Sequence, residues 1–239
     1  MMRLAFPIYS RTSDIEELRR FHERATRIHA AVLLPLLSLL IVLAPDLVPW
    51  VFGERWAPAA GAVQILAVAG MIAAVLTGYP QILLAAGRPR ALLVFNIVLL
   101  VLYALSSWIA APYGITALAL SVVGVHVAMI VAVYGILFRV LLGIPIGRLV
   151  SDLLPAIACS LALLAAAAPL ATLLRNIGTP VPVLAIVVGV VGSLVYASAL
   201  RSFFAVVWND IVQLTARVLP EGARTVQFRR IAMRRVGEA

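Results

Sequence analysis

Apolar residues occur along most of this chain in long runs that are separated by short clusters of charge, proline and glycine. Residues 28–45 contain 18 consecutive uncharged residues, and residues 56–87 contain 32. About 20 apolar residues are needed to cross a hydrocarbon core of about 30 Å. These two runs therefore predict a membrane hairpin, with the second span over about residues 58–84.

The segment between these runs, PDLVPWVFGERW, has the composition of a membrane interface. Trp50, Phe52 and Trp56 lie beside charged side chains, and amphipathic rings favour the headgroup layer, where one side is apolar and the other is wet. An ordinary turn that contains two tryptophans is the alternative. The clustering of the rings favours the interface.

Four further spans follow from the same pattern. Residues 91–138 form 48 residues without Asp, Glu or Arg, interrupted only by the turn residues APYG at 111–114. They predict spans at 92–110 and 115–137. After an interfacial link at 139–152, the apolar run at 153–174 predicts the fifth span, and residues 176–200 contain the sixth.

The start of the chain is patterned differently. Residues 1–9 are apolar, and we expect them to be the end of a membrane helix whose beginning is missing. Ser13 and Glu16 have the spacing of a capping box, which predicts a helix that begins there. Its mixed apolar and charged faces predict an amphipathic helix at the interface up to residue 27. Pro35 is then expected to kink the first span.

Small residues at four-residue spacing predict close helix contacts in three spans. The second span also contains the sequence GYPQ at 78–81, which predicts a break near its far end. The predicted ridges are Gly70–Ala74–Gly78, Ala158–Ala162–Ala166 and Gly189–Ser193–Ala197.

Composition shows which solvent this chain requires. Apolar residues make up 64% and charged residues 12% of the sequence, and the mean hydropathy is +1.09. Such a chain has too little polar surface for a soluble globule, so we predict an all-α polytopic membrane protein whose six spans form one bundle. The expected parts are residues 1–27, the bundle at 28–200 and a basic tail at 201–239.

Charge predicts the orientation and one class of partner. All 19 basic residues are arginine, against 10 acidic residues. With six spans, 17 arginines fall on one side, and the positive-inside rule places that side and both termini in the cytoplasm. Because the charges lie outside the apolar runs, anionic membrane lipids are the expected partners, and nucleic acid is not.

Few residues in the sequence could carry chemistry. It contains no metal-ligand spacing, phosphate loop or nucleophile motif, so we expect neither an enzyme nor a cofactor. Cys159 is expected to be a small packing residue. Gln81, Asn96 and His126 are the candidate substrate-binding residues, because polar groups within a span face a cavity or a partner. For His126, a neutral imidazole bonded to a helix carbonyl stays the alternative, and Asn96 is open to a role in helix packing.

Several segments together resemble a known family. FPIYSR, then D-x-x-x-L-R-R, the hairpin at 34–70 and LLAAGRPR are similar to the second half of bacterial lipopolysaccharide and exopolysaccharide flippases of the multidrug/oligosaccharidyl-lipid/polysaccharide exporter superfamily. The likeness is greatest to colanic-acid-exporter-like members. It covers residues 6–152, and the last two spans by hydropathy.

This resemblance implies a function and a partner. Such proteins move an undecaprenyl-diphosphate-linked oligosaccharide across the inner membrane between two helical lobes that alternate access, with an ion gradient as the energy source. We expect the amino-terminal lobe to be absent here. The chain is then either one flippase lobe, a half transporter similar to multidrug exporters, or a membrane subunit that recruits glycan-assembly proteins without transporting.

Overall fold

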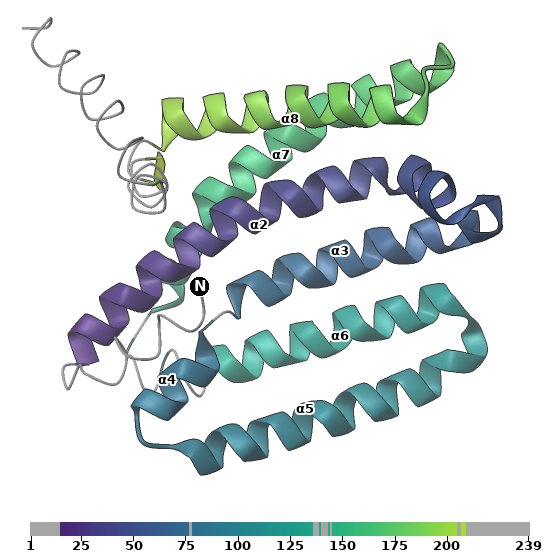
Figure 1. Cartoon of the computed structure of the whole chain (residues 1–239). Helices are drawn as coiled ribbons and strands as arrows, with labels where there is room; N and C mark the ends of the chain where they lie inside the picture. Colours follow the sequence, from purple (N-terminus) through teal and green to yellow (C-terminus); the bar gives the residue numbers. More distant parts are fainter. Residues whose placement is uncertain are drawn as a thin grey trace, which may run out of the picture.

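The computed structural model describes residues 15–76, 78–135, 139, 143, 145–204 and 207–208. Every described element is a helix (Figure 1). Within this part of the chain, six helical segments are long and apolar enough to cross a membrane, as predicted. The elements are α2 Ile15–Phe52, η1 Glu54–Ala59, α3 Ala60–Val75, α4 Tyr79–Ala85, α5 Pro89–Ala110, η2 Ala111–Tyr113, α6 Ile115–Val133, α7 Ile146–Asn176 and α8 Val181–Phe203.

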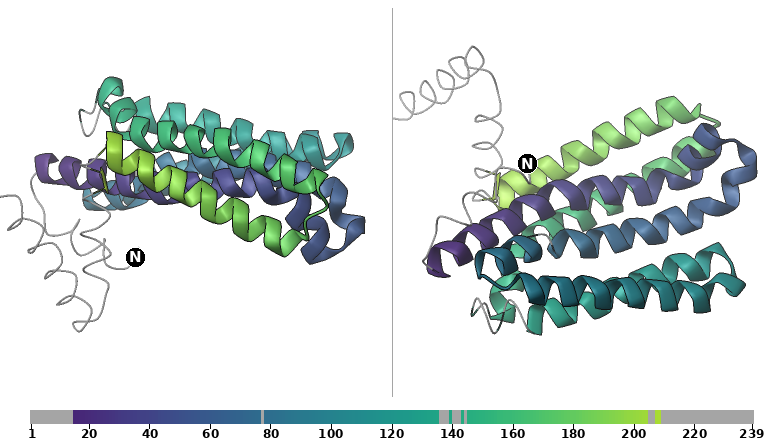
Figure 2. Two further views of the ribbon diagram at one scale, coloured as in Figure 1. Left: turned by 90° about the horizontal axis from the view of Figure 1, so that it is seen from above. Right: turned by 60° about the horizontal axis from the view of Figure 1, so that its bottom comes forward.

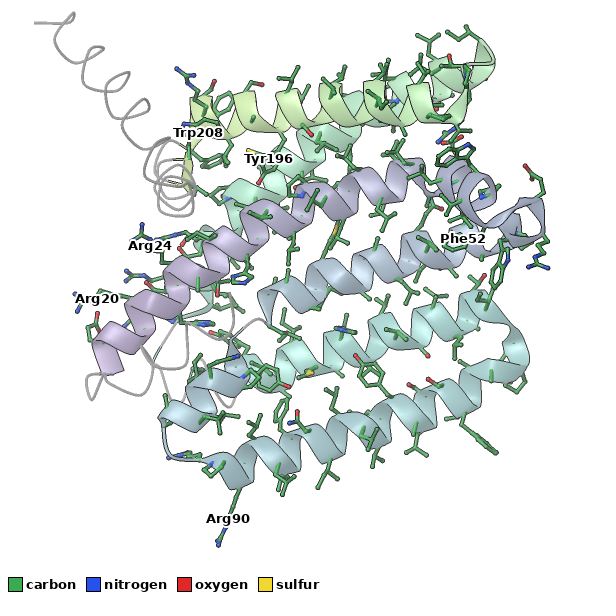
Figure 3. All side chains as sticks on the ribbon, viewed as in Figure 1. Arg20, Arg24, Phe52, Arg90, Tyr196 and Trp208 are labelled. Carbon is green, nitrogen blue, oxygen red and sulfur yellow. The ribbon has the colours of Figure 1, made fainter. Side chains whose placement is uncertain are left out.

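The helices lie side by side, with α8, α7 and α2 at one side and α3, α6 and α5 following in that order (Figures 1 and 2). Helix α2 packs against α3, α7 and α8, whereas α5 packs mainly against α6. The helix ends gather at two opposite faces. We name them the basic end, where Arg20, Arg24 and Arg90 lie, and the aromatic end, where Phe52 lies (Figure 3).

The first span is longer than the sequence pattern predicts. Helix α2 continues without interruption from Ile15 to Phe52, a length of 38 residues or about 57 Å, against a hydrocarbon core of about 30 Å. The predicted interfacial helix is therefore the beginning of α2. The predicted turn is also shorter than expected, because the chain stays helical through Trp50 and turns only at Gly53, where φ is 93°.

The other predicted spans are present with shifted bounds. The break at GYPQ separates α3 from α4, and α5 and α6 begin and end close to the expected positions. The predicted link at 139–152 is wrong in its second half, because α7 already begins at Ile146. Pro145 precedes that helix, and its fixed φ suits the position before a first turn. The capping box at Ser13, residues 1–9 and most of the basic tail lie outside the described residues.

Three prolines lie inside α2 without breaking the helix, and at two of them, Pro35 and Pro45, a neighbouring helix donates to the carbonyl that proline leaves free. A helical N–H normally bonds the carbonyl four residues earlier, and proline has no N–H. Pro35 thus frees the carbonyl of Ala31, which accepts from the Tyr196 hydroxyl of α8 at 2.7 Å. Pro45 frees the carbonyl of Ile41, which accepts from Gln64 Nε2 of α3 at 2.7 Å. The polar side chains therefore complete the backbone hydrogen bonding of α2.

Small residues permit close packing at two positions of the helix contacts. A Cβ added at Gly70 would lie 3.1 Å from Leu37 of α2, so part of the predicted α3 ridge is confirmed. A Cβ at Gly192 would lie only 2.9 Å from Leu39, a contact that the sequence pattern did not single out. The predicted α7 and α8 ridges make no such contact within the described residues, since Ala158 is exposed and a Cβ added at Gly189 would meet nothing within 4 Å. In alanine-rich helices the four-residue spacing occurs on several faces, so it does not select the packed one.

Candidate functional site

The break between α3 and α4 places non-helical backbone inside a span. Leu76 follows α3 and is buried, and Gly78 adopts φ 96°, a left-handed conformation that glycine tolerates. Helix α4 then adds 7 residues, so the break lies about 10 Å from the end of the span at Ala85. At membrane depth such backbone is stable only where protein buries it or where it lines water.

Polar side chains adjoin this break. The Tyr79 hydroxyl of α4 donates to Asn96 Oδ1 of α5 at 3.2 Å, and the Tyr79 ring packs against Phe95 at a centroid distance of 5.5 Å. Gln81, the third residue of α4, has a buried Oε1 without a hydrogen-bond partner among the described residues. Asn96 itself is exposed. An exposed amide is costly in hydrocarbon, so this surface favours water or a polar ligand.

A second polar contact lies deeper, between α5 and α6. His126 Nδ1 lies 2.9 Å from the carbonyl of Val122 and therefore donates to it. The Tyr103 hydroxyl lies 3.1 Å from Nδ1 and 3.3 Å from Nε2, and in that tautomer only Nε2 can accept from it. His126 is 11 residues into α6, or about 16 Å along its axis, which is near the middle of a bilayer core. The imidazole thus contacts both a carbonyl of its own helix and a side chain of α5.

The predicted site residues lie on three adjacent elements but do not form one cluster. Asn96 and Tyr103 are separated by two turns of α5, about 10 Å. The structure gives no contact that joins Gln81 to Asn96 or His126. We name the whole set the α5 polar strip; it consists of Tyr79, Gln81, Asn96, Tyr103 and His126. The two tyrosines were not predicted, although Tyr79 lies in the GYPQ break and Tyr103 follows Asn96 by seven residues.

Buried charge at the basic end was also not predicted. Asp152 was expected in the interfacial link at 139–152, but it belongs to α7 and is only 8% exposed. Its Oδ1 accepts from Arg27 Nη1 of α2 at 3.0 Å. Nearby, Glu23 Oε1 lies 3.2 Å from the Nε atoms of both Arg19 and Arg148. The Arg27–Asp152 and Glu23–Arg148 pairs join the first turns of α7 to α2, and we name these two pairs the basic-end clasp.

A second ionic contact joins the same two helices at the aromatic end. Arg175 of α7 donates to Asp46 of α2 through Nε, at 2.9 Å to Oδ1, and through Nη2, at 2.7 Å to Oδ2. Nη2 also donates to the Val42 carbonyl at 2.8 Å. The planar guanidinium of arginine can donate two parallel hydrogen bonds to a carboxylate, and the ammonium group of lysine cannot match this geometry. We name this contact the aromatic-end clasp.

The described residues contain no group of three or more His, Cys, Asp or Glu side chains that could hold a metal ion. Cys159 is buried in α7, where the prediction placed it as a packing residue. The α5 polar strip offers hydrogen bonding from hydroxyl, amide and imidazole groups. Such groups suit a ligand rich in hydroxyls.

Comparisons with known proteins identify similar sequences. Residues 1–61 match a family described as polysaccharide biosynthesis protein. The chain is 30% identical over 113 residues to the teichuronic acid biosynthesis protein TuaB of Bacillus subtilis (strain 168), an overlap of 47% of this chain and 23% of the relative. No solved structure matches the chain. The chain is thus similar to polysaccharide-biosynthesis membrane proteins over part of its length, and the likeness to colanic-acid exporters stays a prediction.

Proposed function

We propose that this chain is one lobe of a flippase that moves a lipid-linked oligosaccharide, of the undecaprenyl-diphosphate type, across the bacterial inner membrane for polysaccharide biosynthesis. The observation that carries the proposal is the α5 polar strip beside a broken span, in a chain similar to polysaccharide biosynthesis proteins. The two parts of that observation support different parts of the proposal. The similarity supports a sugar-containing substrate, and the strip supports a polar path along which that substrate crosses the membrane.

The strip supports passage because of the cost of moving polar groups through lipid. A pyrophosphate-linked sugar carries charge and many hydroxyls, and these enter hydrocarbon only where protein and water replace their hydration. Tyr79, Gln81 and Asn96 offer both donors and acceptors to hydroxyls. We assign them, with His126, to the sugar path. The reaction is transport, with no bond made or broken by the protein.

The orientation we propose follows from the arginines at the basic end. Arg20, Arg24 and Arg90 lie there (Figure 3). By the positive-inside rule this end faces the cytoplasm, together with both termini, and it contacts anionic lipids. The sugar would then enter the strip near Asn96 and leave toward the aromatic end.

We further propose that transport needs a second lobe. Alternating access in such transporters moves one helical bundle against another around a shared site. The described residues supply a single set of six spans, and the α5 polar strip is open on one side because Asn96 is exposed. A second lobe, from another chain or from a longer form of this protein, would close it.

Reconstitution tests both proposals. The pure chain in liposomes, loaded with labelled lipid-linked oligosaccharide, is expected to leave the label inaccessible from outside. Adding a matching amino-terminal lobe is expected to start flipping. Efficient flipping by a demonstrated monomer would refute the need for a second lobe. Flipping by a homodimer would show that self-association builds the two-lobe cavity.

Site variants test the sugar path in the active two-lobe form. Asn96→Leu is expected to slow flipping, whereas Asn176→Leu, which changes an exposed asparagine at the end of α7, is expected to leave the rate unchanged. Equal rates for both variants would remove Asn96 from the path. If no lobe combination flips the substrate while the chain still co-purifies with glycan-assembly proteins, the non-transporting subunit is the better reading.

A further inference from the structure

We propose that α2, α7 and α8 form one rigid unit, the clasped block, and that helix α5 moves against it. This inference goes beyond the proposed function, because it concerns which helices move and not which molecule is carried. It rests on where the charged contacts, the close packing and the exposed surface of the described residues lie.

Helices α2 and α7 are joined at both ends by ion pairs. The basic-end clasp connects Arg27 to Asp152 at 3.0 Å, and the aromatic-end clasp connects Asp46 to Arg175 at 2.7 Å. The two pairs lie 19 residues apart on α2, or about 28 Å along its axis. Sliding or tilting of α7 against α2 would separate at least one partly buried carboxylate from its arginine, which is costly. The pairs therefore oppose relative motion along the whole span.

Helix α8 is attached to the same unit between the clasps. Its Tyr196 hydroxyl donates to the Ala31 carbonyl of α2 at 2.7 Å, a bond that the backbone of α2 needs because of Pro35. Gly192 of α8 allows Leu39 of α2 and Leu163 of α7 to pack against the helix backbone. Losing these contacts would leave a buried carbonyl without a donor.

Helix α5 has none of these attachments. Arg90 is its only charged residue, and α6, the helix it mainly packs against, contains no Asp, Glu, Arg or Lys, so no ion pair can connect the two helices. The hydrogen bonds of α5 with α6 and α4 run through Tyr103–His126 and Tyr79–Asn96, without a carboxylate or a guanidinium group. Ala110 is the only buried residue of α5, whereas α6 and α4 contribute buried residues to a core shared with α2 and α7. A helix with as little buried surface as α5 has a low cost of local displacement.

Movement of α5 would change access to the sugar path. Asn96 and Tyr103, two residues of the α5 polar strip, lie on the moving helix. Their hydrogen bonds lead to Tyr79 of α4 and His126 of α6, helices that share a core with α2 and α7. Displacement of α5 would separate these pairs and consequently change access to the strip.

Spin-label distances in the full chain, reconstituted in lipid nanodiscs with Cys159→Ala, test this division. Three exposed positions at the ends of different helices carry the labels: Phe52 (63% exposed), Ile177 (68%) and Trp108 (83%). The Phe52→Cys/Ile177→Cys pair reports on the clasped block and is expected to give one narrow distance distribution. The Phe52→Cys/Trp108→Cys pair reports on α5 and is expected to give a wider distribution or two resolved distances.

A clasp variant tests the cause of the rigidity. Arg175→Gln is expected to widen the Phe52–Ile177 distribution, whereas Arg201→Gln, at an exposed arginine without an ion pair in the described residues, is expected not to. Asp46→Asn is the substitute if Arg175→Gln does not insert. Equally narrow distributions for both labelled pairs, or an unchanged Phe52–Ile177 distance in the clasp variant, would overturn the proposal. Neither measurement depends on transport, so flipping can fail without affecting this test.

Discussion

Removing the hydroxyl of Tyr196 tests whether a side chain from one helix completes the backbone of another. In Tyr196→Phe the Ala31 carbonyl loses its donor at 2.7 Å, and Pro35 cannot replace it. Both Ala31 and Tyr196 are buried, so water does not reach the carbonyl. We expect the free energy of unfolding to fall.

The magnitude follows from the cost of an unsatisfied buried group. Leaving a buried acceptor without a partner costs about 1–3 kcal/mol in soluble proteins. Hydrogen bonds between membrane helices average about 0.6 kcal/mol with a maximum of about 1.7. Because the proline removes the usual alternative donor, we expect the upper part of the membrane range, about 1.5 kcal/mol.

A double-mutant cycle with Pro35→Ala isolates this effect. That substitution returns an N–H to α2, so Tyr196→Phe in the Pro35→Ala background is expected to cost about 0.5 kcal/mol or less, a coupling of about 1 kcal/mol. Equilibrium unfolding in mixed detergent micelles measures each free energy. Tyr113→Phe, at an exposed tyrosine of η2, is the control and is expected to be neutral. An equal cost of Tyr196→Phe in both backgrounds would refute the pairing of hydroxyl and proline.

Three further predictions concern packing, the site and topology. Gly192→Ala places a Cβ 2.9 Å from a leucine of α2 and is expected to lower stability by about 1 kcal/mol, whereas Gly189→Ala meets open space and is expected to be neutral in the same unfolding assay. If His126 borders the sugar path, a cysteine at that position is expected to react with a water-soluble thiol reagent in the folded protein, and protection in every trapped conformation would make it a packing residue. A reporter fused after Arg88 is expected to be cytoplasmic and one after Arg55 periplasmic, and a cytoplasmic reporter at residue 55 would invert the topology.

The number and order of the spans could be predicted because hydrocarbon imposes a length on each apolar run. Helix ends were less predictable. Charged residues suggested an interface at 13–27 and at 139–152, but Glu23 and Asp152 are paired inside the structure with arginines of another helix. A charge within a helix looks the same in the sequence whether it faces water or a buried partner.

The candidate site could be predicted in part. Polar residues within spans were identified by their rarity, which located Asn96 and His126, but the structure supplies their partners Tyr79 and Tyr103. Tyrosine is common in membrane helices, so it did not stand out. The clasp of Asp46 with Arg175 joins residues 129 positions apart, and no local pattern in the sequence pairs them.

The carbonyls of α2 that lose their usual donor to a proline suggest a rule for other membrane proteins. Each proline within a span removes the usual donor of one carbonyl, four residues earlier. In this chain Ala31 and Ile41 obtain theirs from Tyr196 and Gln64, on two different helices. A proline in one apolar segment therefore suggests a short distance between the carbonyl four residues before it and a Tyr or Gln of another segment. This distance is a testable restraint for assembling membrane helices before any coordinates exist. Where the restraint holds, the polar residue is already engaged and is a poor candidate for binding substrate.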